Sequence, residues 1–281
     1  MSDQASAAGQ PERASTVEVV ALEPHITMIR LNRPERLNAL SFELVADLHS
    51  ALDAVGNDPQ CKVVILTGAG RGFCSGMDLK HFGRPPLPGE HPHVRVGIDP
   101  QTFISNLTVH MRDTPQTIIA AVNGVAYGGG FALACAADIR LSSSTARFCS
   151  AFIRTGLSGT DIGITYLLPR LIGNSRAFDL ILTGREIDAA EAFQMGVVSK
   201  VAEPDELDDL ALGYARTLAG YTASGLRTTK QVLWQNAAAP TLESALALEI
   251  RNQNLLQHAP DVQEFMTAYR LATTGITGHP G

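Results

Sequence analysis

The sequence predicts an α/β fold in which strand–helix units fill the first two-thirds of the chain and helices alone fill the last third. Three observations support this. Short apolar or alternating runs alternate with helical patterns up to about residue 163, glycine-rich turns follow several of these runs, and only helical spacing continues beyond that point. With 281 residues, 45% of them hydrophobic and 18% charged, the chain is long and apolar enough to bury a sizeable core.

The expected elements follow in order along the chain. Strands are expected at residues 16–22, 26–31, 62–67, 117–122 and 138–143, with a short apolar segment at 146–154. Helices between them are expected at 41–55, where Ser41 is a suitable N-cap, and at 101–112 and 131–137. The C-terminal helices are expected at 166–171, 175–183, 189–195, 203–218, 228–236, 242–257 and 260–272.

The chain divides by composition into three parts. Residues 1–15 are polar and rich in alanine and serine, lack the apolar run of a signal peptide, and are interpreted as a disordered leader. Residues 16–200 form the strand–helix core, and residues 201–281 form a helical C-terminal region. Within the core, residues 82–100 carry five prolines and three glycines, which predicts a mobile surface loop long enough to be a lid or an insertion.

Charge and cysteine content narrow the class of function. The formal net charge of −6 argues against a nucleic-acid partner, which usually needs a basic face. No apolar run reaches the roughly 20 residues of a membrane span, so no membrane partner is expected. The four cysteines, Cys61, Cys74, Cys135 and Cys149, show no zinc-ligand spacing and suggest reduced thiols in the cytoplasm.

The stretch from Ala121 to Ala134 has the pattern of a ligand-binding turn. A buried strand is followed by Gly124, by three consecutive glycines at 128–130, and then by a helical run of small residues. The first N–H groups of a helix have no partner within the helix, and glycine allows a ligand to approach them closely. This arrangement favours an anionic or strongly polar group of a ligand.

A second stretch of the same kind, Cys74–Leu79, also follows a strand and a turn. Neither stretch matches the GxGxxG or GxxxxGK[ST] phosphate loops, and no GxSxG nucleophile motif is present. Two backbone N–H groups that converge from two such turns would make an oxyanion hole, which stabilises a carbonyl oxygen as it gains negative charge. The alternative is that these glycines only permit close packing of strand and helix.

The sequence resembles the crotonase superfamily, the enoyl-CoA hydratase/isomerase family. The matching segments, in order, are residues 31–40, 63–79, 121–130, 137–140, 168–173 and 182–189. The resemblance implies a spiral of ββα units with a helical C-terminal trimerisation region, usually assembled as a homotrimer or a dimer of trimers. It also implies an acyl-CoA thioester substrate whose carbonyl oxygen lies between two N–H groups, here those of Met77 and Gly129.

The positions that carry acid–base chemistry in hydratases of this family are apolar here. The resemblance places two glutamates at Ala132 and Phe152, and neither side chain can transfer a proton. Together with Cys149, these two residues are expected to line the substrate pocket. The pattern therefore disfavours water addition by the two-glutamate mechanism and favours isomerisation or another enolate reaction.

Asp161 is the carboxylate that remains near the expected site. It lies eight residues before Pro169, the spacing that the resemblance assigns to a catalytic aspartate in dienoyl-CoA isomerases. An apolar pocket would raise its pKa and make it a better base. The alternative is that Asp161 caps a helix that begins near Ile162.

The coenzyme A moiety is expected to contact two loops. The resemblance implies contacts from Arg36, Asn38, Ala39, Gly76, Asp78 and Lys80, with Arg36 nearest a phosphate and Lys80 next. The alternative for Arg36 is a solvated turn residue. The basic strip 227–230 is a further candidate. No cofactor beyond the CoA of the substrate is expected, and His91 and His93 lack a neighbouring carboxylate cluster, so no metal site is predicted.

These observations predict an acyl-CoA enzyme of the hydratase/isomerase kind that acts in fatty acid metabolism through an enolate. Met77 and Gly129 hold the carbonyl oxygen and Asp161 carries the proton. Two alternatives stay open, a CoA-thioester binding protein without catalytic activity and a hydrolase or other thioester reaction.

Overall fold

The computed structural model describes residues 15–97 and 99–274, and its strands form two sheets. The large sheet has the strand order β1-β2-β3-β5-β7-β10 and the small sheet the order β4-β6-β8-β9. The strands are β1 (Val17–Glu23), β2 (Ile26–Leu31), β3 (Val63–Gly68), β4 (Gly72–Cys74), β5 (Thr117–Val122), β6 (Val125–Tyr127), β7 (Ile139–Ser143), β8 (Arg147–Cys149), β9 (Glu186–Asp188) and β10 (Lys200–Ala202).

Successive units of the chain each give one strand to the large sheet and the next strand to the small one. The pairs β3 and β4, β5 and β6, and β7 and β8 follow this rule, and these six strands pair in parallel within each sheet, whereas β1–β2 and β8–β9 are antiparallel. A helical segment then returns the chain to the start of the next unit. This repetition is the spiral of ββα units that the sequence resemblance implies, so the predicted fold class is confirmed.

Ten α-helices and two short 3₁₀ helices are found in the described residues. They are η1 (Pro34–Arg36), α1 (Phe42–Asn57), α2 (Pro100–Asp113), α3 (Gly129–Ala136), η2 (Ala151–Thr155), α4 (Ile164–Ile172), α5 (Asn174–Thr183), α6 (Ala189–Met195), α7 (Leu207–Ala219), α8 (Ala223–Asn236), α9 (Leu242–Leu256) and α10 (Pro260–Thr274). The predicted N-cap of α1 is confirmed, because Ser41 Oγ accepts a hydrogen bond from Leu44 N.

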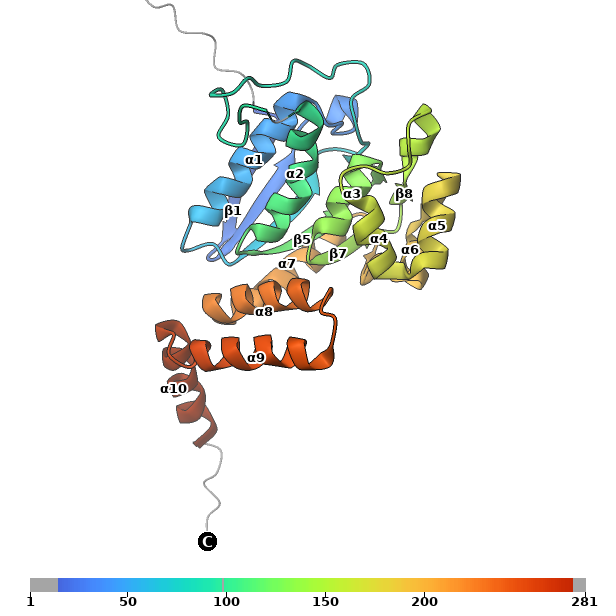
Figure 1. The fold of residues 1–281 in the computed structure, drawn as a ribbon. Helices are drawn as coiled ribbons and strands as arrows, with labels where there is room; N and C mark the ends of the chain where they lie inside the picture. The colour runs from blue at the N-terminus through green and yellow to red at the C-terminus, as the bar shows by residue number, and fades with distance from the viewer. Residues whose placement is uncertain (1–14, 98, 275–281) are drawn as a thin grey trace, which may run out of the picture.

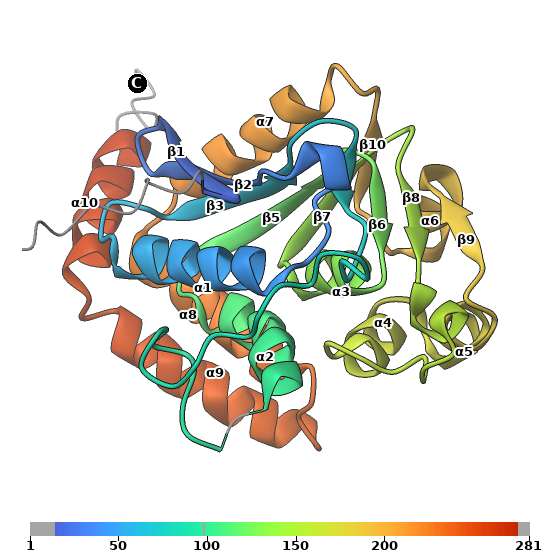
Figure 2. The same cartoon turned by 90° about the horizontal axis from the view of Figure 1, so that it is seen from above.

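The helices cover the large sheet on both faces, as Figure 2 shows. α1, α2 and α3 lie on one face and bury the main core together with apolar residues of both sheets. α7 lies on the other face, against β3, β5 and β7, and buries Leu207, Ala211 and Ala215 there. β5 is buried at every position because helices cover both of its faces, which explains its uninterrupted apolar sequence.

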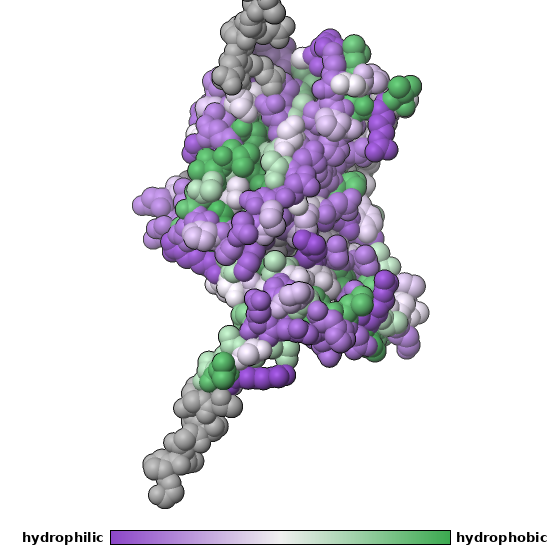
Figure 3. Space-filling model, turned by 90° about the vertical axis from the view of Figure 1, so that its left-hand side faces the viewer, coloured by the Kyte–Doolittle hydropathy of each residue, from purple (hydrophilic) through white to green (hydrophobic). Residues whose placement is uncertain are grey.

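The last three helices lie below the two sheets in Figure 1, with α8 next to β5 and with α9 and α10 beyond it. α8 contacts both α9 and α10, and no residue of α9 is buried. On the face shown in Figure 3, hydrophobic side chains gather in patches on the main body and again on the helical part below it. The division of the chain at residue 200 stays a prediction.

Two sequence predictions need comment. Strands were expected to end before residue 163, but β9 and β10 follow α5 and α6, and three residues each are too few to show an alternating pattern. Residues 1–14 of the predicted leader lie outside the described residues. Among the described helices, none combines the length and the apolar character that a membrane crossing requires.

Candidate active site

Two loops that leave the small sheet lie side by side, one after β4 and one after β6. β4 and β6 are parallel neighbours, with Cys74 opposite Ala126, so the residues that follow each strand remain close together. A Cβ atom built on Gly76 would lie 2.8 Å from Tyr127 O and 3.5 Å from Gly129 N. With φ of +88°, Gly76 also has a backbone conformation that favours glycine. The fold thus brings the two predicted glycine loops into contact.

The N–H groups of Met77 and Gly129 lie on these loops. Met77 forms a parallel bridge with Leu40. The two hydrogen bonds of this bridge run from Leu40 N to Gly76 O and from Asp78 N to Leu40 O, so the N–H of Met77 itself takes no part in it. Gly129 is the first residue of α3, so its N–H has no acceptor within the helix. Within the described part of the chain, no hydrogen bond from either N–H was found.

Apolar side chains surround Gly129. A Cβ atom on Gly129 would lie 2.7 Å from Leu40 Cδ1 and 2.8 Å from Ile162 Cδ1, and the ring of Phe152 lies beside Gly128. Ala132 is fully buried one turn further along α3. The arrangement offers backbone N–H groups in an apolar setting, where hydrogen bonds to a developing anion are strongest.

Asp161 is held against the start of α2. Its Oδ1 atom accepts hydrogen bonds from Gln101 Nε2 at 2.7 Å, from Ser105 Oγ at 3.4 Å and from Ile162 N at 2.7 Å. Its Oδ2 atom accepts none from the described residues. The alternative that Asp161 caps the next helix is wrong, because α4 begins at Ile164 with Gly163 as its N-cap and no side chain caps it.

Ile162, next to Asp161, has φ of +49°. Positive φ is unusual for a β-branched side chain and persists only where surrounding contacts enforce it. Here the Asp161 carboxylate accepts the Ile162 N–H, and the side chain is buried against the Gly129 position. Loop 156–163 therefore places a carboxylate and an apolar wall on adjacent residues.

Arg33 and Asp78 connect the two loops predicted to contact coenzyme A. Arg33 Nη2 lies 2.9 Å from Asp78 Oδ2, and Arg33 Nη1 also donates to Ala39 O. Burial would raise the pKa of Asp78, but hydrogen bonds from His81 N, Arg33 and Lys80 N outweigh it and hold the pKa below its usual value. Asp78 is thus an ionised structural partner of Arg33.

The other predicted CoA contacts differ in exposure. Asn38 is fully buried and donates to Ala69 O and Gly72 O, which fixes the loop. Arg36 is more accessible, with Nη2 3.1 Å from His81 Nε2, and Lys80 is exposed. Of the basic strip 227–230, Arg227 is exposed whereas Lys230 is buried and bonded inside the fold. Lys80 and Arg227 are therefore the exposed cations of this group, and Arg36 is partly exposed.

Cys149 is buried, and its Sγ atom lies 3.0 Å from Gly184 O. Burial raises the pKa of this thiol, so it is held in its neutral form. All four cysteines are buried and free. Pocket lining by Cys149 stays a prediction.

Sequence reasoning missed the residues that support the site from a distance. Leu40, Gln101 and Ser105 are far from Gly129 and Asp161 in sequence, so no local spacing connects them. Arg33 could have been noticed, because it belongs to the same matching segment as Arg36 and a buried carboxylate such as Asp78 needs a partner.

Comparisons with known proteins show the family to which the chain belongs. The enoyl-CoA hydratase/isomerase family model matches residues 22–272. A probable enoyl-CoA hydratase of Mycobacterium bovis is 42% identical over 238 residues, which are 84% of each chain. The 1,2-epoxyphenylacetyl-CoA isomerase of Escherichia coli is 37% identical over 248 residues, covering 88% of this chain and 93% of the other.

Solved structures show the same architecture. A probable enoyl-CoA hydratase/isomerase from Mycobacterium abscessus aligns with a TM-score of 0.81 at 36% identity, and the alignment covers 92% of this chain and 96% of the other. The relatives thus carry both hydratase and isomerase names.

Proposed function

Because the chain belongs to the enoyl-CoA hydratase/isomerase family, and so is an enzyme of that kind, we propose that it isomerises an enoyl-CoA thioester through an enolate. The thioester oxygen accepts hydrogen bonds from the N–H groups of Met77 and Gly129, which act as an oxyanion hole. The observation that carries the proposal is the close approach of two loops whose N–H groups have no other acceptor in the described residues.

The enolate is stabilised because negative charge develops on an oxygen that already faces two fixed donors. Removing one donor of this kind typically costs about 100- to 1,000-fold in rate. The walls formed by Leu40, Ile162 and Phe152 exclude water, which strengthens both hydrogen bonds.

Asp161 carries the proton. Its Oδ1 is fixed by Gln101, Ser105 and its own neighbour, while Oδ2 accepts no hydrogen bond from the described residues and is available to the substrate. A single carboxylate can remove a proton from one carbon of the acyl chain and return it to another, which moves the double bond. Isomerisation needs no activated water, which suits a chain with Ala132 and Phe152 in place of two glutamates.

The remaining parts of the proposal concern the ligand and the assembly. Arg36 and Lys80 are the cations proposed to contact the CoA phosphates, beside the loop residues Asn38, Ala39, Gly76 and Asp78. The enzyme needs no cofactor beyond the substrate's own CoA and has neither nucleic-acid nor membrane partners. It assembles as a homotrimer or a dimer of trimers in the cytoplasm, where its four buried thiols stay reduced.

Exchange of the substrate's α and γ protons with deuterated water tests enolate formation without assuming a product. We expect the enzyme to incorporate deuterium into a 3-enoyl-CoA and to form the conjugated 2-enoyl-CoA. Mass spectrometry measures the incorporation. In Asp161→Asn both rates fall by about 100- to 10,000-fold, the usual contribution of a general base. Binding of the substrate, measured by calorimetry, changes little because the oxyanion hole is intact.

The matched control is Asp179→Asn, which removes a carboxylate that pairs with Arg185 away from the site. Exchange that survives Asp161→Asn at the wild-type rate would exclude Asp161 as the proton carrier. Hydration of crotonyl-CoA without isomerisation would show a hydratase. Thioester cleavage would show a hydrolase, and tight binding with no exchange would overturn the enolate mechanism itself.

A further inference from the structure

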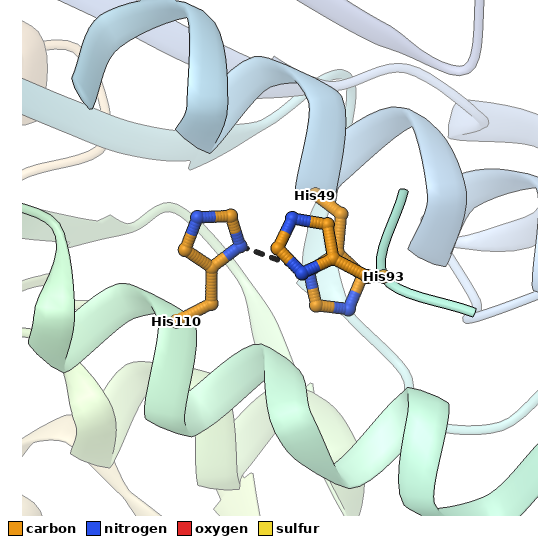
Figure 4. A group of neighbouring side chains, drawn as sticks. All are labelled: His49, His93 and His110. Carbon is orange, nitrogen blue, oxygen red and sulfur yellow. Dashed lines mark hydrogen bonds between the residues drawn. The ribbon is translucent and has the colours of Figure 1, made fainter. Parts of the chain in front are cut away.

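Three histidines from separate segments meet between α1 and α2, as Figure 4 shows. His49 comes from α1, His110 from α2, and His93 from the loop that joins β4 to α2. One ring nitrogen from each lies within 4.8 Å of those of the other two. Asp53, one turn after His49 on α1, adds a carboxylate, with Oδ2 3.0 Å from His93 Nε2 and Oδ1 3.3 Å from His110 Nε2. The cluster does not include Met77, Gly129 or Asp161.

The hydrogen bonds around the cluster leave two ring nitrogens facing each other. His49 Nε2 lies 3.1 Å from Phe103 O, a carbonyl that can only accept, so this nitrogen carries the proton and His49 Nδ1 carries a lone pair. His110 Nε2 lies 3.3 Å from Asp53 Oδ1. His110 Nδ1 lies 2.9 Å from His49 Nδ1, so in the absence of an ion the His110 Nδ1–H can donate to the His49 lone pair. Transfer of this proton to His110 Nε2, beside Asp53, would leave two lone pairs that face each other and could bind a metal ion.

We propose that His49, His93 and His110, with Asp53, form a binding site for a divalent transition metal ion, most suitably Zn²⁺. Imidazole and carboxylate ligands suit this ion. Tetrahedral coordination with Zn–N bonds of about 2.0–2.1 Å places ligand atoms about 3.3 Å apart. The separations of 2.9 Å between His49 Nδ1 and His110 Nδ1 and of 3.0 Å between His93 Nε2 and Asp53 Oδ2 are close to that spacing.

The surroundings suit a metal site in three further respects. Ligating histidines usually give their second N–H to a carbonyl or carboxylate, as His49 gives Nε2–H to Phe103 O. Burial lowers the pKa of His49 to about 3, so its ring is neutral and able to bind a metal. The side chains of His93 and Asp53 are 31% and 40% exposed, which gives the ion a path from solvent.

One ring must turn when the ion binds. The His93 ring stacks on the His49 ring, with centroids 4.5 Å apart and planes 18° from parallel, so its in-plane lone pair cannot meet that of His49 as it stands. At 31% exposure, the His93 side chain is the least buried of the three histidines, so it is the ring expected to turn. His91 fixes the backbone beside it, because His91 Nε2 bonds to Ala46 O and its Nδ1 accepts from His93 N.

His93 lies in the segment 82–100, for which the sequence predicts a lid or an insertion. A metal ion would fasten this loop to α1 and α2 through His93. The spacing of His91 and His93 alone predicts no metal site, because the other ligands come from residues 49, 53 and 110. The fold brings these distant ligands together, which the local sequence around His93 could not show.

Metal binding to the full chain, expressed without a polyhistidine tag and stripped with a chelator, tests the proposal. We expect one Zn²⁺ per chain by calorimetry, and Co²⁺ is expected to give the intense visible absorption of tetrahedral coordination. Asp53→Asn should weaken binding by about 10- to 100-fold, and His93→Ala, which removes a ligand, by more. Both changes are at partly exposed side chains, so folding is expected to survive and is checked by circular dichroism.

The matched control is His258→Ala, which removes an exposed histidine outside the cluster and should bind Zn²⁺ like the wild type. Absence of saturable binding, or equal affinities in His93→Ala and His258→Ala, would overturn the proposal. The cluster would then be held together by a proton on His110. The assay measures metal binding alone, so a negative result would not bear on the enolate mechanism. Likewise, failure of the deuterium-exchange test would not bear on metal binding.

Discussion

The ion pair between Arg33 and Asp78 fixes the loop that carries the Met77 N–H. Both side chains are largely buried, at 13% and 6% exposure, and Asp78 Oδ1 also accepts from the backbone of Lys80 and His81. A charge at such a position is stable only with its partner and its hydrogen bonds in place. The pair therefore stabilises the geometry of residues 76–81.

This pair predicts an acid-dependent loss of stability. The pKa of Asp78 in the folded state lies below its usual 3.8, so folding is favoured by the ionised form. That contribution is complete above the unfolded-state pKa and disappears as pH falls from about 4 through the lowered folded-state pKa. We expect Asp78→Asn to cost about 2 kcal/mol in the free energy of unfolding at pH 7 and much less near pH 2.5, measured by urea denaturation.

Asp205→Asn, which changes an exposed aspartate, is the matched control and should alter stability little at either pH. An equal loss of stability for Asp78→Asn at both pH values would contradict the argument, because the effect would then not depend on ionisation.

At the scale of single residues, the order of the family motifs along the chain gave more candidate site residues than the chemical type of any one residue did. The matching segments named Met77 and Gly129, and β4–β6 pairing explains why these distant residues approach each other. The roles of Lys230 and His49 were beyond reach of the sequence. Lysine and histidine on a helix usually face solvent, and only the packing of a second helix shows that these two are buried.

At the scale of elements, α8 is attached to the sheets by a polar contact. Lys230 Nζ lies 3.0 Å from Asp138 Oδ2 and also donates to Met111 O and Gln116 O, while Trp234 Nε1 donates to Asp138 Oδ1 at 2.8 Å. The Lys230 and Asp138 side chains are only 4% and 13% exposed. Burial lowers the pKa of Lys230, and the Asp138 carboxylate opposes that effect.

We predict that Lys230→Met destabilises the chain by about 3–5 kcal/mol, because it leaves Asp138 and two carbonyl groups buried without their donor. The double variant Lys230→Met with Asp138→Asn removes the unpaired charge and should regain part of that loss. Free energies of unfolding from urea denaturation provide the measurement, with Arg227→Met on the exposed side of α8 as control. A Lys230→Met variant as stable as Arg227→Met would show that the contact contributes nothing.

Helices and strands were predicted correctly from the sequence where they are long enough for the spacing of their apolar residues to form a pattern. α1 and α2 have apolar positions at helical spacing over 14 residues or more, and β3 and β5 are continuous apolar runs. The short strands of the small sheet have three residues each, too few for a pattern, and they exist because the neighbouring strand is already in place. Their position could be inferred only from the resemblance to a known fold.

At the scale of the whole molecule, the order of the matching segments was enough to predict the spiral of the core and its family. It could not predict the histidine cluster, because α1, the loop before α2 and α2 itself come together only through their packing on the sheet. Nor could it give the hydrogen bonds between α2 and loop 156–163 that orient Asp161. Long-range side-chain contacts are the part of the site that sequence patterns do not encode locally.

The C-terminal helix α9 carries exposed apolar residues that bear on how chains associate. Leu242, Leu246 and Ile250 follow one another at intervals of four residues on α9, with 70%, 43% and 60% exposure, so they form a continuous apolar stripe. An exposed stripe of this kind on a separate helical part usually marks an interface. It supports the proposed homotrimer, in which these residues would be buried between chains.

We therefore predict that the wild-type chain sediments at three or six times the mass of one chain, and that Leu246→Glu with Ile250→Glu shifts it to the monomer. Each glutamate replaces an apolar side chain that would be buried between chains, so the variant loses that burial and would have to bury two charges instead. Ser175→Glu, an exposed change on α5, should leave the assembly intact. If the double variant kept the wild-type mass in analytical ultracentrifugation, α9 would lie outside the interface, and another exposed apolar surface would have to join the chains.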